Sequence, residues 1–230
     1  MLEAILDYER ELFLMLNGCH TPFLDRFMWL YSGKAVWLPL AVFVVGVLVY
    51  RKNWRESLLV VLSIALVILL CDQFASHLCK PLFARFRPTY HPEFMDQVKT
   101  VFGYRGGRYG FISSHAANAF GFAMFMSLLF RYRIFTWTIF LWAALNAYTR
   151  IYLGVHFISD IIPGAIAGLV FGYLVYRIYV RVRKQKVCGV GEEPLSTNYS
   201  DRRKLLIVFG ILITVLILLA CNTLLTAFLR

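Results

Sequence analysis

Acidic residues are scarce in this sequence. Of its 230 residues, 13 are Asp or Glu and 24 are Lys or Arg, which gives a formal net charge of +11 at pH 7. A magnesium ion that binds beside substrate phosphates needs carboxylate ligands, and the polar loops of this chain hold few of them. We therefore expect no metal site and no cofactor, and we expect Lys and Arg to neutralise any bound anion.

Cysteine is sparse as well. The five cysteines form no C-x-x-C motif. Such motifs indicate zinc or redox sites, and regularly spaced cysteines in a short secreted chain would indicate disulfides. The sequence therefore predicts neither a zinc site nor a disulfide framework. The five residues are Cys19, Cys71, Cys79, Cys188 and Cys221.

Hydrophobic residues, in contrast, make up 60% of the chain, and the mean hydropathy is +0.65. Both values are higher than a soluble domain needs and indicate a membrane protein. A spanning helix requires about 20 mostly apolar residues. We therefore predict an all-α fold, an integral membrane helical bundle with about six transmembrane helices. The segments that qualify or nearly do are roughly 35–50, 57–78, 116–130, 134–149, 160–180 and 205–226.

The chain divides into four predicted parts. Residues 1–34 carry an apolar face against a charged one, a pattern typical of an amphipathic helix that lies in the membrane interface. Residues 35–186 form the membrane core that holds the candidate catalytic residues. Residues 187–204 are polar and contain Gly, Pro and Ser, so they predict a cytoplasmic linker. Residues 205–230 form a last transmembrane helix.

Short basic clusters indicate the orientation. They follow the first, third and fifth spans, and the positive-inside rule places that side in the cytoplasm. Loops 79–115 and 150–159 then share the external side. Loop 79–115 still holds six basic residues against two acids, which anion binding would explain. Because the basic residues lie in clusters between apolar runs, we expect a lipid bilayer and no nucleic acid as partner.

Three segments place ionisable residues at the edges of apolar runs, where a charge is costly unless it has a function. The predicted topology brings all three to one membrane face. They are KPLFARFRP with Lys80 and Arg87, FISSHAANAF with Ser113, Ser114 and His115, and TRIYLGVHFISD with Arg150, His156 and Asp160.

His156 and Asp160 predict an activated nucleophile. They are four residues apart, so in a helix they lie on one face and the carboxylate can accept a proton from one imidazole nitrogen. The other nitrogen is then unprotonated and can attack phosphorus. We predict that His156 is the nucleophile and that Asp160 orients it.

Three cations would bind the phosphate in this arrangement. Lys80, Arg87 and Arg150 supply positive charge for the equatorial oxygens of a transferring phosphoryl group, and Arg suits bidentate contact. The charge of these side chains would stabilise the transition state.

The middle segment opens an expected helix. Ser113 and Ser114 lie at its N-terminus, where free backbone N–H groups and the helix dipole favour an anion. His115 then lies beside the phosphate and can protonate the leaving oxygen. We predict that both serines bind phosphate and that His115 is the general acid.

In this order and spacing the three segments resemble the motifs K-x6-R-P, P-S-G-H and S-R-x5-H-x3-D of the type 2 phosphatidic acid phosphatase superfamily. The resemblance covers about residues 57–180. It implies a helical bundle, a phosphate site near the outer face of the membrane in which the protein lies, and a covalent phosphohistidine intermediate without a metal. The fully matching positions are Lys80, Arg87, Pro88, Arg150, His156 and Asp160.

The chain departs from the family pattern at three positions. Ser113 and His115 match the second motif, but Ile112 stands where the family has Pro and Ser114 where it has Gly. Thr149 replaces the Ser that opens the third motif. The hydroxyl of Ser114 enters the predicted phosphate pocket, where it could add a hydrogen-bond donor or narrow the site.

The resemblance leaves several functions open. The leading hypothesis is hydrolysis of a lipid phosphate or diphosphate at the external leaflet of a bacterial inner membrane. The candidate substrates are undecaprenyl diphosphate, phosphatidylglycerol phosphate and a phosphate of lipid A. The alternatives are a phosphotransferase that uses the same phosphohistidine, and a scaffold protein with a relic site. We expect loop 89–110 to form part of the pocket roof, and we expect Arg85, Arg105 and Arg108 to face solvent or lipid headgroups.

Overall fold

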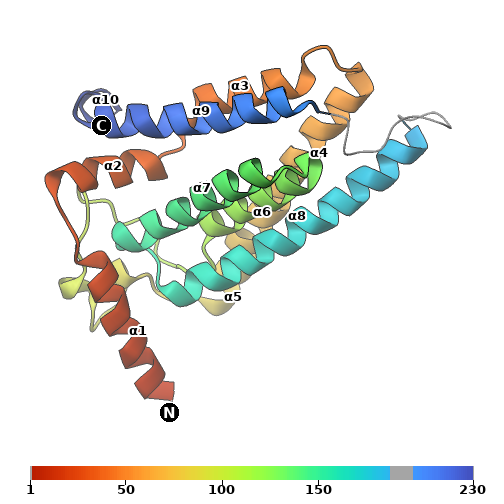
Figure 1. Cartoon of the computed structure of the whole chain (residues 1–230). Helices are drawn as coiled ribbons and strands as arrows, with labels where there is room; N and C mark the ends of the chain where they lie inside the picture. The colour runs from red at the N-terminus through yellow and green to blue at the C-terminus, as the bar shows by residue number, and fades with distance from the viewer. Residues whose placement is uncertain (1, 187–198, 230) are drawn as a thin grey trace.

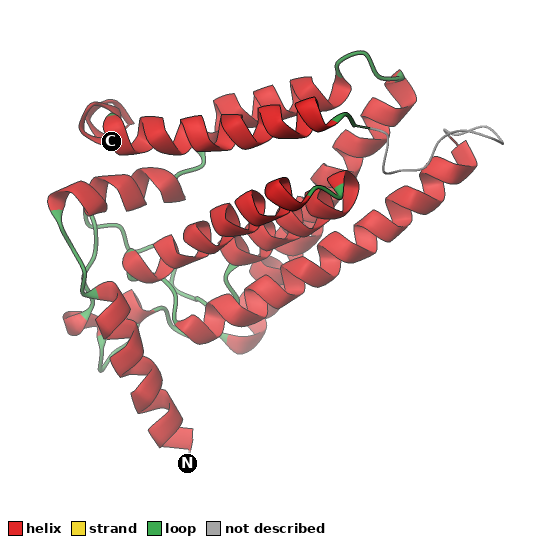
Figure 2. Ribbon diagram, in the orientation of Figure 1, coloured by secondary structure: helices red, strands yellow, loops and turns green. Residues whose placement is uncertain are grey.

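The computed structural model describes residues 2–186 and 199–229, and the regular elements in these ranges are helices (Figure 2). One isolated β-bridge joins Phe86 and Tyr109. The main helices are α1 (Leu2–Asn17), α2 (Pro22–Ser32), α3 (Leu38–Val49), α4 (Trp54–Asp72), α5 (Lys80–Phe83), α6 (Ser114–Phe130), α7 (Arg133–Tyr152), α8 (Ile158–Lys186), α9 (Asp201–Ala220) and α10 (Asn222–Leu229). The predicted all-α class is confirmed.

Several helices are long and apolar enough to cross a membrane. Residues Trp54–Phe83 run as one helix through a π-helical stretch between α4 and α5, and α8 and α9 also qualify. Helix α2 and the helical residues Ala35–Val49 qualify together, bent by 69° at a short break. The chain is thus an all-helical, multi-pass membrane protein.

Helices α6, α7 and α8 lie side by side with α4, and α3 pairs with α9 along one side of this group (Figure 1). Helix α6 is only 17 residues long and is buried along most of its length, with small residues (Ala and Gly) in its first half. Because it packs inside the bundle, most of its surface meets protein and little of it needs to meet lipid.

Glycines bring α6 and α8 into close contact. Gly164, Gly168 and Gly172 repeat every fourth residue, so they share one face of α8. A Cβ atom on Gly168 would lie 2.2 Å from the Ala117 carbonyl oxygen, and one on Gly164 would lie 2.7 Å from the Ser113 carbonyl oxygen. Small residues at this spacing allow backbones to approach closely in a membrane. This contact sets the position of the α6 N-terminus against α8.

The predicted amphipathic segment 1–34 contains two helices. Thr21 caps α2, which begins with a proline, and α2 then leads into a short turn of 3₁₀ helix at Ala35–Trp37. Helix α1 ends against the C-terminal end of α7: Asn17 Nδ2 donates to the Ile151 and Tyr152 carbonyls at 3.2 and 2.9 Å. In the predicted linker 187–204, residues 187–198 lie outside the described residues, and α9 already begins at Asp201.

Candidate active site

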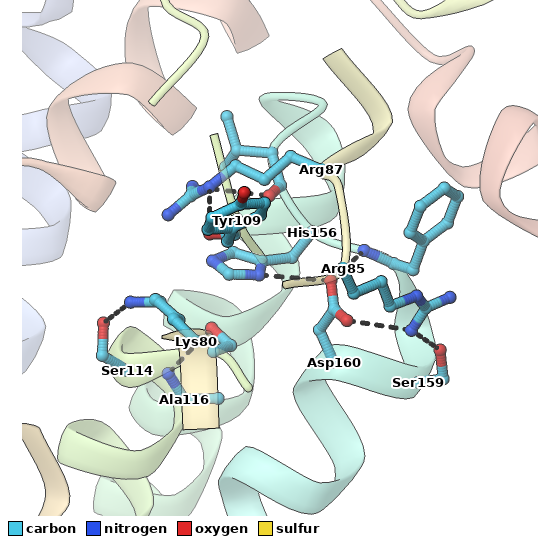
Figure 3. A network of polar contacts seen from close by, with 12 residues as sticks. Lys80, Arg85, Arg87, Tyr109, Ser114, Ala116, His156, Ser159 and Asp160 are labelled. Carbon is cyan, nitrogen blue, oxygen red and sulfur yellow. Dashed lines mark hydrogen bonds and ion pairs between the residues drawn. The ribbon is translucent and has the colours of Figure 1, made fainter. Parts of the chain in front are cut away.

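The three polar segments meet at one end of the bundle, as the topology predicted. Lys80 opens α5, Ser114 opens α6, and His156 precedes α8. Lys80 Nζ donates to Ser114 Oγ at 3.3 Å across 34 positions of sequence. Figure 3 shows His156 between this pair on one side and Asp160 on the other.

His156 contacts Asp160 as predicted, although the local structure differs from a simple helix. His156 lies in the connection before α8, and Asp160 lies in the first turn of that helix. Asp160 Oδ2 is 3.4 Å from His156 Nδ1 and also accepts the Phe157 N–H at 3.0 Å. The same carboxylate therefore caps the start of α8 and contacts the imidazole at Nδ1, so Nε2 is the nitrogen that is not directed at Asp160.

The surroundings of His156 favour its neutral form. Its side chain is 1% exposed. Burial lowers the pKa of His156 well below its ordinary value, and the charges of Arg87, Arg150 and Lys80 lower that pKa further. Both causes disfavour the imidazolium. An unprotonated nitrogen is what a nucleophile for phosphorus requires.

The predicted phosphate ligands Arg87 and Arg150 are buried beside His156. Arg87 Nε donates to the Tyr109 carbonyl at 3.0 Å, which fixes the guanidinium. Gly106, at φ +69°, lies against that guanidinium, because a Cβ there would be 2.6 Å from Arg87 Nη1. Arg150 donates to the Ser32 hydroxyl and to Tyr104 OH, and its buried Nε has no hydrogen-bond partner among the described residues.

The start of α6 is organised as predicted, but its two serines differ. Ser113 is fully buried and its hydroxyl caps the helix by accepting the Ala116 N–H at 3.4 Å. Its own N–H donates to the Asp160 carbonyl at 2.9 Å. The half-buried Ser114 contacts Lys80, which also donates to Ser76 Oγ at 3.2 Å. Lys80 is thus positioned by two hydroxyls.

A cavity of about 470 Å³ opens beside these residues. His115 and Arg150 lie in its wall, whereas the buried His156 is not among the lining residues. Helices α2 and α10 and the residues just after α2 supply much of the remaining wall. The lining residues are Trp29, Leu30, Ser32, Gly33, Lys34, Ala35, Val36, Tyr104, His115, Arg150, Leu153 and Leu229.

The cavity lining combines mostly apolar side chains with two cations, Lys34 and Arg150. A ligand with a hydrocarbon part and a phosphate would match both, because the apolar part leaves water and the phosphate meets Arg150. Within the described residues, no three His, Cys, Asp or Glu side chains are grouped so that they could hold a metal ion.

The prediction for Arg85 was wrong. Its guanidinium does not face solvent or headgroups: Nη1 donates to Asp160 Oδ1 and Nη2 to Glu9 Oε2, each at 2.9 Å. Arg105 and Arg108, in contrast, are exposed as expected. Sequence reasoning also missed Ser32 and Lys34 at the cavity. No local pattern marks these residues, since their contacts join segments far apart in the chain.

The chain matches known proteins over most of its length. The model of the PAP2 superfamily matches residues 56–184. A lipid A 4′-phosphatase of Porphyromonas gingivalis is 50% identical over 184 residues, which are 80% of this chain and 78% of that protein. A lipid A 4′-phosphatase of Bacteroides thetaiotaomicron is 43% identical over 77% of this chain and 80% of its own length.

Two crystal structures share the fold. Aquifex aeolicus LpxE is 29% identical, with a TM-score of 0.55 over 73% of this chain and 93% of that chain. A PAP2-type phosphatidylglycerolphosphate phosphatase from Bacillus subtilis is 22% identical, with a TM-score of 0.58 over 81% of this chain and 89% of that chain. At this identity the second likeness concerns the fold alone.

Proposed function

Since this chain belongs to the PAP2 superfamily and is a membrane lipid phosphatase, we propose that its substrate is lipid A and that it removes the 4′-phosphate. The observation that carries this proposal is the 50% identity to a lipid A 4′-phosphatase over 80% of the chain. Of the three substrates that the sequence left open, lipid A is the one favoured by both curated relatives.

The lining of the cavity supports the proposal that the substrate is a bulky glycolipid. Trp29 and Tyr104 offer aromatic faces, and Leu30, Val36 and Leu229 offer apolar ones. Sugars pack against aromatic rings through their C–H faces, and acyl chains gain free energy from contact with aliphatic side chains. A disaccharide that carries both phosphate and acyl chains uses each of these surfaces.

In the proposed first step, His156 Nε2 attacks phosphorus while Asp160 holds the proton on Nδ1. The bond between phosphorus and the sugar oxygen breaks. His115 gives its proton to that oxygen, so the sugar leaves as an alcohol and the phosphoryl group remains on His156. Lys80, Arg87 and the Arg150 guanidinium neutralise the charge on the equatorial oxygens.

In the second step, water attacks the phosphohistidine and transfers a proton to His115, which now acts as the base. The phosphorus–nitrogen bond breaks and inorganic phosphate leaves. His156 returns to its neutral form, and His115 is protonated again for the next substrate. The pKa of His156, lowered by burial, favours this return.

We also propose the membrane arrangement that the sequence predicted. About six helices cross the bilayer of a bacterial inner membrane, and the site faces the periplasm. Helices α6 and α7 complete the count. The neighbours of α6 shield most of it from lipid, whereas α7 exposes the apolar side chains of Ile134, Trp137 and Leu141. In this scheme residues 35–186 are the catalytic core, 1–34 cover the site end, and 205–230 add a transmembrane helix at the edge.

The test is phosphate release by the detergent-purified full chain in the presence of EDTA. We would compare lipid A that carries only the 4′-phosphate with lipid A that carries only the 1-phosphate. We expect release from the first and little from the second. Phosphatidylglycerol phosphate and undecaprenyl diphosphate complete the substrate panel.

The matched control is His156→Ala, which should elute from size-exclusion chromatography like the wild type and release no phosphate. Wild-type turnover of the 1-phosphate alone would contradict the proposed substrate. Turnover by His156→Ala near the wild-type rate would contradict the nucleophile. Loss of wild-type activity in EDTA would contradict a reaction without a metal.

A further inference from the structure

Helix α1 reaches the candidate nucleophile through two charged side chains. Glu9 of α1 is 14% exposed and Arg85 of the loop after α5 is 28% exposed. Arg85 Nη2 donates to Glu9 Oε2 at 2.9 Å, while Glu9 Oε1 accepts the Ser159 N–H at 2.8 Å. One carboxylate therefore joins Arg85 to the first turn of α8.

Arg85 continues this chain of contacts to Asp160. Its Nη1 donates to Asp160 Oδ1 at 2.9 Å and to Ser159 Oγ, as Figure 3 shows. The Phe157 ring lies 4.7 Å from the guanidinium carbon and covers it. Both nitrogens at the end of Arg85 are thus engaged by protein, and its position is determined from several sides.

The contacts of Asp160 show why Arg85 matters. Oδ2 serves His156 and the Phe157 N–H, and Oδ1 is bound by Arg85. The Asp160 side chain is 0% exposed. A buried carboxylate without a cation tends to take up a proton, and it then no longer accepts one from imidazole. The Arg85 guanidinium favours the ionised carboxylate and fixes the position of Oδ1.

We propose that Glu9 and Arg85 are positioning residues for the reaction, and that α1 thereby forms part of the active site. Glu9 fixes the position of the Arg85 guanidinium, Arg85 fixes the Asp160 carboxylate, and Asp160 orients the His156 ring. This inference rests on the proposed role of His156 and Asp160. It adds a segment outside the residues 56–184 that match the family.

The docking of α1 supports this role. Phe13 is completely buried between the rings of Phe94 and Phe157, with centroids 5.6 and 5.4 Å away. Asn17 at the end of the helix accepts the Lys99 N–H at 2.9 Å. Glu9 therefore reaches Arg85 from a helix that is fixed by packing and hydrogen bonds.

The first test is the Glu9→Gln variant of the full chain, with Glu11→Gln as the matched control. Glu11 lies two residues further along α1 and is exposed, so it loses the same charge at a different face. We expect kcat on lipid A to fall about tenfold in Glu9→Gln, the effect of a small misplacement near the reacting atoms. KM and the thermal unfolding midpoint should stay near the control.

The second test is the pH profile of Arg85→Gln. The charged or titratable groups that face Asp160 are Arg85, His156, Arg87 and Lys80, and only the first is changed. Without Arg85, the carboxyl of Asp160 keeps its proton to higher pH. The acidic limb of the profile, where kcat/KM falls as the pH decreases, should therefore move to higher pH. A loss of folded protein would lower the rate at all pH values and leave the limb in place.

The possible results distinguish a failure of this inference from a failure of the proposed function. A kcat of Glu9→Gln equal to that of Glu11→Gln, or an acidic limb unmoved in Arg85→Gln, would overturn the positioning role. In that case His156→Ala would still be inactive. Full activity of His156→Ala would instead overturn the proposed nucleophile, on which the positioning role depends.

Discussion

The two histidines of the site differ in their surroundings. His156 is 1% exposed and contacts the Asp160 carboxylate, while His115 lies half-buried in the cavity wall. A buried neutral imidazole suits attack on phosphorus, and a histidine at the cavity suits exchange of protons with substrate and water. This difference in position is consistent with the proposed roles.

At this scale we predict that Asp160→Asn lowers kcat on lipid A by about two orders of magnitude or more, because the amide cannot hold His156 in the required tautomer. Both carboxylate oxygens accept hydrogen bonds, so the amide NH₂ group would face either Arg85 or His156, each of which presents a donor. Phosphate release measured at saturating substrate checks the value. A fall of less than about tenfold would mean that Asp160 does not orient His156.

Among the elements, α6 and α8 bring the two halves of the site together. Gly164 meets the backbone of Ser113, at the N-terminal end of α6. The first turn of the same α8 carries Asp160. Any side chain that separates the two helices would therefore also separate His115 from His156.

At this scale we predict that Gly168→Ala destabilises the protein by about 1–3 kcal/mol, the usual cost of overpacking. Gly46→Ala in α3 is the matched control, because a Cβ there meets nothing within 4 Å. The control should gain roughly 0.5–1 kcal/mol from the better helix former. Thermal unfolding in one detergent measures both. Equal midpoints for the two variants would show that the α6–α8 contact has more room than the geometry indicates.

For the whole molecule, the ends of the bundle differ in character. At the end opposite the site, Arg183 Nε lies 2.9 Å from Glu56 Oε2, and Arg131 donates to Tyr176 OH at 3.1 Å. The basic clusters used for the orientation therefore gather at one end. The candidate active site lies at the other.

At this scale we predict that reporter fusions after residues 52 and 190 report the cytoplasm, and that a fusion after Gly107 reports the periplasm. A phosphatase reporter, active only outside the cytoplasm, and a fluorescent reporter, bright only inside it, give opposite signals at each site. The same signal at 52 and 107 would contradict a bilayer crossing between them. A reversal of all three would place the site in the cytoplasm.

By itself, the sequence determined the helical membrane class, the three polar segments and the pairing of His156 with Asp160. These features depend on the length of apolar runs and on short spacings, both of which are local. The structure confirms that the three segments meet and that α6 starts at Ser114. The roles of these residues stay predictions.

Only the tertiary structure decided which basic residues face the site and which support it. No sequence pattern distinguishes Arg85 from Arg105 and Arg108. In the structure, however, Arg85 contacts Glu9, which is 76 positions away, and Asp160, which is 75 positions away. The cavity likewise joins Lys34, Tyr104 and a residue of α10. Such contacts depend on how distant helices pack. A local sequence pattern does not predict that packing. The partner of a buried charge can come from any segment that the fold brings near it.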